Sequence, residues 1–156
     1  MNAAPSQVVL AMQGVTVNRG NKRILGPIDF RIQSGERWVI LGPNGAGKST
    51  LLNILATRIF PTSGTVSILD KQMGKVDLSE LRTRIGICAS LLAEDIPDDE
   101  FVRDVVLTAA YAVIGRWNEV YDLWDESRAV ALLTTFGVRD FADRRGAADV
   151  ARCPSD

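Results

Sequence analysis

The chain has 156 residues, of which 46% are hydrophobic and 24% charged, and its formal net charge is −1. These values are typical of a globular protein, and the length is sufficient for one domain with a hydrophobic core. No apolar run approaches the roughly 20 residues that span a bilayer, and the N-terminus has no secretory-signal pattern. The sequence contains no histidine, which excludes a histidine base, a histidine metal ligand and a histidine pH switch.

The charges are divided unevenly along the chain. Residues 1–90 carry 11 Lys and Arg against 5 Asp and Glu, whereas residues 91–156 carry 7 against 14. The basic first part suits an anionic ligand, but no basic stripe with interleaved aromatic residues is present, so we predict no nucleic-acid partner. Two cysteines, Cys88 and Cys153, have neither a disulfide-framework nor a metal-site spacing. We therefore expect a reducing, cytoplasmic location.

The first part of the chain is predicted to be rich in strands. Apolar runs between turn residues indicate strands at residues 8–12, 15–17, 24–32, 38–41, 65–69 and 85–88, with Gly14 as a possible site of a bulge. A helix is expected from about residue 48 to residue 59, because Pro61 and Gly64 break the pattern after it. A short helix is expected at residues 77–82, with Asp77 as its N-cap.

Beyond Ser90 the pattern becomes helical. An acidic loop surrounds Pro97, and apolar residues with helical spacing follow from Phe101. A second helix is expected over residues 127–136 and ends at Gly137. The chain is thus predicted to have a mixed α/β core followed by helices.

Residues 42–50 read Gly-Pro-Asn-Gly-Ala-Gly-Lys-Ser-Thr and fit the phosphate-loop pattern G-x-x-x-x-G-K-[ST]. The expected strand before them and helix after them provide the strand–loop–helix context of that motif. Its glycines let successive main-chain N–H groups point at a polyphosphate, and the helix N-terminus adds the positive end of its dipole. Lys48 is expected to bind the β- and γ-phosphates and Ser49 to hold Mg²⁺. The predicted binding residues are Gly42, Pro43, Asn44, Gly45, Ala46, Gly47, Lys48, Ser49 and Thr50.

Several further passages resemble the nucleotide-binding domain of an ABC ATPase, from about Val8 to Arg145. They are Ser34-Gly35-Glu36, Pro61-Thr62-Ser63-Gly64-Thr65-Val66, Leu81-Arg82-Thr83-Arg84-Ile85-Gly86, Phe101-Val102-Arg103-Asp104-Val105-Val106, Phe136-Gly137-Val138 and Phe141-Ala142-Asp143-Arg144. The resemblance implies an α/β fold, with a P-loop NTPase core, an antiparallel β subdomain and the start of a helical subdomain, incomplete at its C-terminal side.

The same resemblance implies what the chain binds and where it works. Residues 42–50 correspond to the family's Walker A loop, so ATP and Mg²⁺ are the implied cofactors. The chain is divided into a partial ABC ATP-binding domain at residues 1–145 and a divergent C-terminal tail at residues 146–156. The implied location is cytoplasmic, including a peripheral position at the inner face of the membrane, and the implied partners are a second ABC ATPase subunit and a membrane permease.

The chain departs from the family at three places. Arg19 stands where the family has an aromatic residue that stacks on adenine, and Ser90 stands where the family has the Q-loop glutamine that contacts the permease. After Arg145 the Leu-Ser-x-Gly signature, the Walker B acidic strand and the switch histidine are all missing. Asp70 is interpreted as a turn residue, and the acidic residues of Trp124-Asp125-Glu126 as a helix edge or N-cap.

These departures leave no residue that we assign to catalysis, so we predict MgATP binding with impaired hydrolysis. A complete transport or stand-alone ATPase is expected only of a longer chain. Two alternatives remain open from the sequence. One is a regulatory or decoy subunit that pairs with a complete ABC ATPase, and the other is a different P-loop NTPase, such as a GTPase or a small-molecule kinase.

Overall fold

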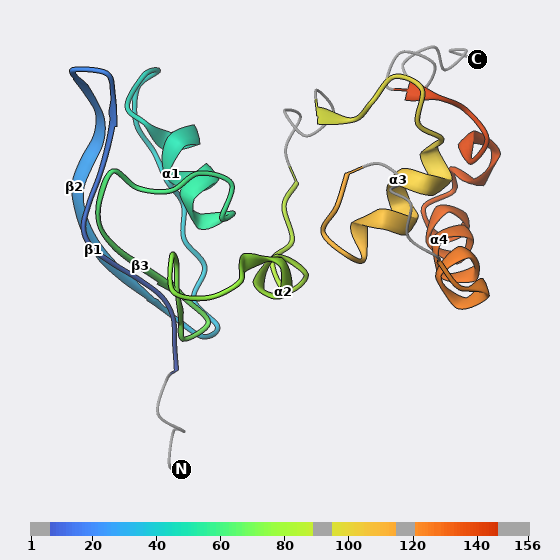
Figure 1. Ribbon diagram of the computed structural model, residues 1–156, viewed down its shortest axis with the longest axis horizontal. Coiled ribbons are helices and arrows are strands. Elements are labelled where there is room, and N and C mark those ends of the chain that lie inside the picture. Colours follow the sequence, from blue (N-terminus) through green and yellow to red (C-terminus); the bar gives the residue numbers. More distant parts are fainter. Residues whose placement is uncertain (1–6, 89–94, 115–120, 147–156) are drawn as a thin grey trace. The chain divides into compact units, whose positions relative to one another are not determined.

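The computed structural model describes residues 7–88, 95–114 and 121–146 (Figure 1). The chain is divided into two compact units, Met1–Ile85 and Gly86–Asp156. Within the described residues, no helix is long and apolar enough to cross a membrane.

The first unit is built on an antiparallel four-stranded sheet in the order β2-β1-β3-β4. Its strands are β1 (Val8–Arg19), β2 (Lys22–Gln33), β3 (Ser63–Ile68) and β4 (Lys71–Gln72). The two short strands expected at residues 8–12 and 15–17 form the single strand β1, with a shift of register between Met12 and Val15. Gly14 lies in this irregularity, where its N–H donates to Asp29 Oδ1 at 2.7 Å. The predicted bulge at Gly14 is therefore confirmed.

Two helices accompany this sheet. Helix α1 (Lys48–Leu55) is shorter than expected, and helix α2 (Leu78–Arg82) begins after Asp77, whose carboxylate accepts a hydrogen bond from the Ser79 N–H at 2.9 Å. The predicted N-cap is confirmed. The apolar core lies between sheet and helices, and its largest fully buried apolar side chains are Met12, Val15, Ile54 and Val66.

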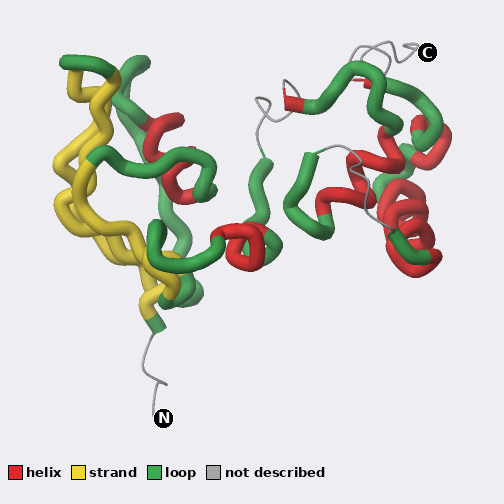
Figure 2. Tube along the Cα trace, viewed as in Figure 1, coloured by secondary structure: helices red, strands yellow, loops and turns green. Residues whose placement is uncertain are grey.

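The strands expected at residues 38–41 and 85–88 are not formed, and this part of the prediction was wrong. The whole run between β2 and α1 is loop (Figure 2). Trp38, Val39 and Leu41 are 56%, 79% and 87% exposed, so the segment is not buried either. An apolar run becomes a strand only when another strand completes its hydrogen-bond ladder, and no strand of the described residues pairs with these two segments.

The second unit is helical. It contains α3 (Val102–Ala109), α4 (Leu123–Thr135) and a short 3-10 helix, η2 (Arg139–Phe141). Helix α4 begins four residues before the expected start, because Asp122 caps it in a capping box with Asp125. Trp124-Asp125-Glu126 is consequently the first turn of a helix, and its interpretation as a helix edge is confirmed. Gly137, with φ of 71°, follows the end of α4 as predicted.

Main-chain hydrogen bonds close this unit by joining the residues around the start of α3 to those after η2. Val102 N–H donates to the Arg144 carbonyl at 3.0 Å, and Gly146 N–H donates to the Glu100 carbonyl at 3.1 Å. The guanidinium groups of Arg103 and Arg145 both lie over the ring of Phe101, at 4.9 and 4.3 Å from its centroid. These contacts hold the two ends of the helical unit together.

Candidate nucleotide-binding site

The predicted phosphate loop lies in the first unit, between an extended segment and the first turn of α1. Gly45 and Gly47 both have positive φ, 82° and 87°, a conformation that side-chain-bearing residues rarely adopt. The Ala46 N–H donates to the Pro43 carbonyl at 3.2 Å and closes the turn, and the Leu51 N–H donates to the Gly47 carbonyl at 2.8 Å. Gly47 is the N-cap of α1. The glycines of the motif thus stand where the chain reverses into a helix.

Gly47 also anchors this loop to the sheet. A Cβ atom at Gly47 would lie 2.8 Å from Leu25 Cδ1 and 3.0 Å from the Ile24 carbonyl oxygen, both on β2. A Cβ at Gly45 would meet nothing within 4 Å. The loop is therefore in close contact with β2 at one glycine and open to solvent at the other, and the open side offers room for a ligand.

Lys48 places its positive charge across the loop. Its Nζ donates to the carbonyl oxygens of Gly42 and Pro43, both at 2.8 Å. An ammonium group on a four-carbon stem can exchange such main-chain acceptors for phosphate oxygens by rotating about its side-chain bonds. The structure thus brings the lysine and the glycine turn of the motif together.

The same loop contains main-chain donors that are not engaged. Among the described residues, no acceptor engages the N–H groups of Gly45, Gly47, Lys48 and Ser49. The first turn of α1 contains no acidic residue, so the positive end of the helix dipole is not neutralised there. Free N–H groups, the end of a helix dipole and an ammonium group form a donor set that suits a polyphosphate.

The oxygen donors for a metal ion are few. Ser49 is exposed and Thr50 is half-buried on the first turn of α1, so the Ser49 hydroxyl is available as a ligand. Within the described residues, no group of three or more His, Cys, Asp or Glu could hold a metal ion. A Mg²⁺ ion at this loop would therefore take its other oxygens from the phosphates and from water, as this ion commonly does.

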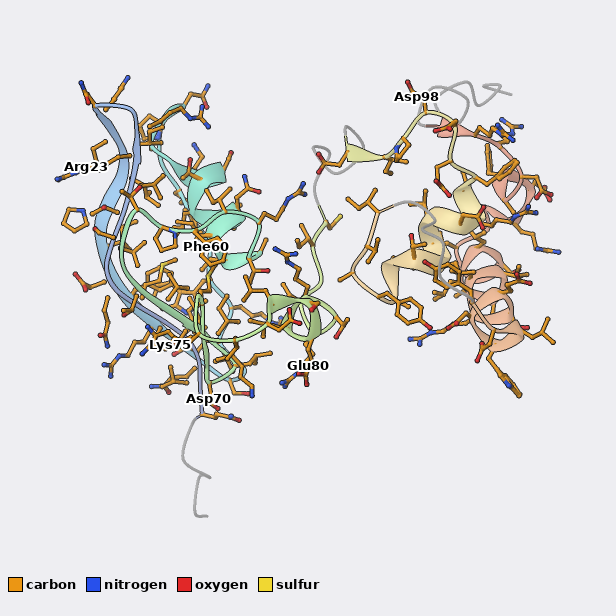
Figure 3. All side chains as sticks on the ribbon, viewed as in Figure 1. Arg23, Phe60, Asp70, Lys75, Glu80 and Asp98 are labelled. Carbon is orange, nitrogen blue, oxygen red and sulfur yellow. The ribbon has the colours of Figure 1, made fainter. Side chains whose placement is uncertain are left out.

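The sequence also singled out three residues outside the loop, Arg19, Asp70 and Ser90. Arg19 ends β1 opposite Lys22, at the hairpin end close to the β2 residues that contact Gly47. Asp70 lies in the turn between β3 and β4 and accepts a hydrogen bond from Gln7 Nε2 at 2.9 Å (Figure 3), which confirms its interpretation as a turn residue. Ser90 lies outside the described residues.

A contact that the sequence analysis missed fixes the segment ahead of the loop. The Glu36 carboxylate accepts from the Gln33 N–H at 2.9 Å and from Trp38 Nε1 at 3.0 Å. These two hydrogen bonds lower the pKa of Glu36 below its ordinary value. The Trp38 ring lies 6.0 Å from the ring of Phe30 on β2. No local sequence pattern predicts this arrangement, because it depends on the path of the backbone after β2.

The comparison with known families shows to which family the chain belongs. The family model described as ABC transporter matches residues 25–152, a range that contains the whole phosphate loop. The chain belongs to this family. It is an ABC-type nucleotide-binding domain, and the GTPase and small-molecule kinase alternatives are set aside.

Curated relatives of this domain support the same assignment. An uncharacterized ABC transporter ATP-binding protein, YlmA of Bacillus subtilis, is 36% identical over 139 residues, which are 88% of this chain and 52% of that protein. A phosphonates import ATP-binding protein, PhnC of Pseudomonas putida, is 32% identical over 121 residues, which are 76% of this chain and 43% of that protein. The chain spans about half the length of the curated relatives it matches.

Solved structures show the fold. The ATP-binding cassette MJ0796, a dimer in a post-hydrolysis state with ADP and Pi, has a TM-score of 0.66 at 23% identity, over 87% of this chain and 61% of that one. The cassette MJ1267 in its ADP conformation has a TM-score of 0.60 at 18% identity, over 90% of this chain and 58% of that one. The predicted α/β fold of P-loop NTPase type, with an antiparallel sheet and only part of the cassette, is confirmed.

Proposed function

We propose that residues 42–50 of this ABC-type domain bind the triphosphate of MgATP. The observation that carries the proposal is that two left-handed glycines, four main-chain N–H groups without an acceptor among the described residues and the Lys48 ammonium all belong to one turn. A triphosphate supplies several anionic oxygens within the reach of these donors, and charge-assisted hydrogen bonds of this kind are about twice as strong as neutral ones.

Each part of the loop has its own task in this proposal. The N–H groups of Gly45 to Ser49 orient the phosphate chain, and Lys48 neutralises charge at its β- and γ-phosphates. Ser49 supplies one protein ligand to Mg²⁺. When bound, Mg²⁺ reduces the repulsion between the negatively charged phosphates. The rest of the loop, Gly42 to Asn44 and Thr50, shapes the turn and holds α1 in place behind it.

We also propose that the 156-residue polypeptide by itself binds MgATP without efficient turnover. The sequence has no histidine, and no acidic residue lies in the first turn of α1. Hydrolysis needs a group that orients the attacking water, and among the described residues no carboxylate or imidazole is hydrogen-bonded to the loop. A steady-state phosphate-release assay checks this part, and turnover that disappears in Lys48→Ala would contradict it.

Binding is tested by energy transfer from Trp38, which precedes the loop by four residues, to a fluorescent methylanthraniloyl-ATP. Trp117 and Trp124 are replaced by Phe so that Trp38 is the single donor. We expect saturable transfer that increases with Mg²⁺ and is displaced by ATP better than by GTP. Lys48→Ala should weaken binding at least ten-fold, and Lys75→Ala, at an exposed lysine (Figure 3), should leave it unchanged. A folded chain without affinity for ATP at millimolar concentration overturns the proposal.

As a component of a transporter, the domain is proposed to work in the cytoplasm with a second ABC ATPase subunit and a membrane permease. The support is the family itself and the solved cassette dimer. Relatives are named for phosphonates import, for HMP/thiamine import and for metal transport, so we assign no transported substrate to this chain. Co-purification with a complete ABC ATPase tests the partnership, and suppression of the partner's ATPase activity by this chain would identify it as a decoy subunit.

A further inference from the structure

Thr57 closes the C-terminal end of α1 in a conformation that its residue type disfavours. Its φ is 57° and it is fully buried. The Thr57 N–H donates to the Ile54 carbonyl and the Arg58 N–H donates to the Asn53 carbonyl, both at 2.9 Å. These two hydrogen bonds form the Schellman motif, in which the residue with positive φ is usually glycine. Because threonine is β-branched, it is strained at this position.

Arg82 of α2 binds both oxygen atoms of this strained residue. Its Nε donates to the Thr57 hydroxyl at 3.1 Å, and its Nη2 donates to the Thr57 carbonyl at 2.9 Å. Glycine would close the same motif without strain, but it has no hydroxyl to accept from Nε. Backbone strain of this kind persists where the surrounding structure over-determines it, and it is concentrated at functional sites. The contact between Arg82 and Thr57 is therefore a candidate for a role beyond closing a helix.

Helix α1 connects this contact to the phosphate loop. Gly47 is its N-cap, and the N–H groups of Lys48 and Ser49 belong to its first turn. The helix has 8 residues, so about 12 Å separates its two ends. Its N-terminal end lies against β2 at Gly47, and its C-terminal end is held by Arg82. A helix this short moves as one rigid element, so a shift at Thr57 also changes the direction of the N–H groups at the loop.

We propose that Arg82 is a positioning residue for the nucleotide site. By holding Thr57 in its left-handed conformation, Arg82 fixes the end of α1 and thereby the direction of the N–H groups of Lys48 and Ser49. It acts from the end of the helix opposite to the loop, so it is not itself a ligand of the phosphates. Its effect on affinity rests on the proposed function, because donors that are fixed before binding reduce the entropy that a bound triphosphate must overcome.

The first measurement involves no nucleotide. Backbone amide resonances of Gly47, Lys48 and Ser49 are recorded by NMR for the natural chain and its variants, each shown to be folded by circular dichroism. We expect these resonances to shift in Arg82→Met. They should keep their positions in Arg84→Met, the control at an exposed arginine two residues further along. Unchanged resonances in Arg82→Met overturn the inference, whether or not the chain binds ATP.

The second measurement is the affinity for MgATP, by energy transfer from Trp38 under conditions in which every variant is folded. Arg82→Met should weaken binding about three-fold to ten-fold, and Arg84→Met should leave it unchanged. Arg82→Lys should give an intermediate affinity, because one ammonium group does not reproduce the two-point contact of a guanidinium. If the natural chain binds MgATP and Arg82→Met binds it equally well, the inference fails and the proposed function stands. If the natural chain does not bind, the proposed function fails and the amide resonances decide on Arg82.

A double-mutant cycle with Thr57→Gly separates positioning from a general loss of stability. Glycine adopts the left-handed conformation without strain, so the end of α1 then needs Arg82 much less. Relative to Thr57→Gly, the double variant Thr57→Gly/Arg82→Met should lose less than about two-fold in affinity, and its loop amide resonances should match those of Thr57→Gly. A three-fold to ten-fold loss that persists in the glycine background overturns the inference, because Arg82 would then act on binding without Thr57.

Discussion

Arg82 on α2 is bound to Thr57, which follows the end of α1. Its Nε donates to the Thr57 hydroxyl at 3.1 Å and its Nη2 donates to the Thr57 carbonyl at 2.9 Å. Thr57 is fully buried and has a φ of 57°, in the left-handed region. A β-branched residue in this conformation is strained, and the two hydrogen bonds from Arg82 help to hold it there. The helix that carries the phosphate loop at its start is thus tied to α2 at its end.

Arg82→Met should lower the free energy of unfolding by about 1–3 kcal/mol, because it leaves the buried carbonyl and hydroxyl of Thr57 without their donors. The measurement is the urea midpoint of the whole chain. Lys75→Met is the control, at an exposed lysine in the loop before α2 (Figure 3), and should change the free energy by less than about 0.5 kcal/mol. Equal effects of the two substitutions would show that the contact with Thr57 contributes nothing measurable.

Gly47→Ala and Gly45→Ala form a second matched pair. Both glycines have positive φ, so each substitution should cost about 1–2 kcal/mol of backbone strain. Only the Cβ at position 47 would collide with Leu25 and the Ile24 carbonyl, so Gly47→Ala should be the more destabilising by about 1–3 kcal/mol. Urea unfolding of the two variants measures the difference. Equal losses in the free energy of unfolding would mean that β2 shifts to accommodate the Cβ atom without loss of stability.

The sequence predicts those parts of the fold that depend on local chemistry. The N-cap of α2 follows from Asp77, and the start of α1 follows from the position of Lys48 after a glycine turn. The phosphate-loop motif likewise predicts that residues 42–50 form one loop. The acceptors that hold the Lys48 ammonium, on Gly42 and Pro43, could not be predicted, because they depend on how tightly the turn closes.

Features that depend on contacts distant in sequence were not predictable. The early end of α1 follows from the buried, left-handed Thr57 and its bond to Arg82, which is 25 residues away. Residues 38–41 have the apolar composition of a strand, but a strand also requires a partner strand, and none among the described residues pairs with them. The start of α4 does have a local signal, since Asp122 and Asp125 form a capping box with an aspartate in place of the usual glutamate or glutamine.

Asp122→Ala should destabilise the helical unit by about 0.5–2 kcal/mol, because the Asp122 carboxylate accepts hydrogen bonds from the N–H groups of Trp124 and Asp125, both at 2.9 Å. Asp122→Asn should retain most of the stability, since asparagine is also a good N-cap. The helical signal in circular dichroism during thermal unfolding is the measurement. If alanine and asparagine behave alike, α4 is held by its packing on α3 alone.

The cap of α2 predicts a dependence of stability on pH. Hydrogen bonds from the side chain and then the N–H of Ser79 lower the pKa of Asp77 below its ordinary value of 3.8. The folded chain therefore binds fewer protons at this carboxyl than the unfolded chain, so its contribution is present above pH 3.8 and is lost as the pH falls through the lowered pKa. Asp77→Asn keeps a capping side chain without the charge. The difference in urea midpoint between the natural chain and this variant should be constant above about pH 5 and shrink towards pH 2. A difference that stays constant over this range would show that the Asp77 charge does not stabilise α2.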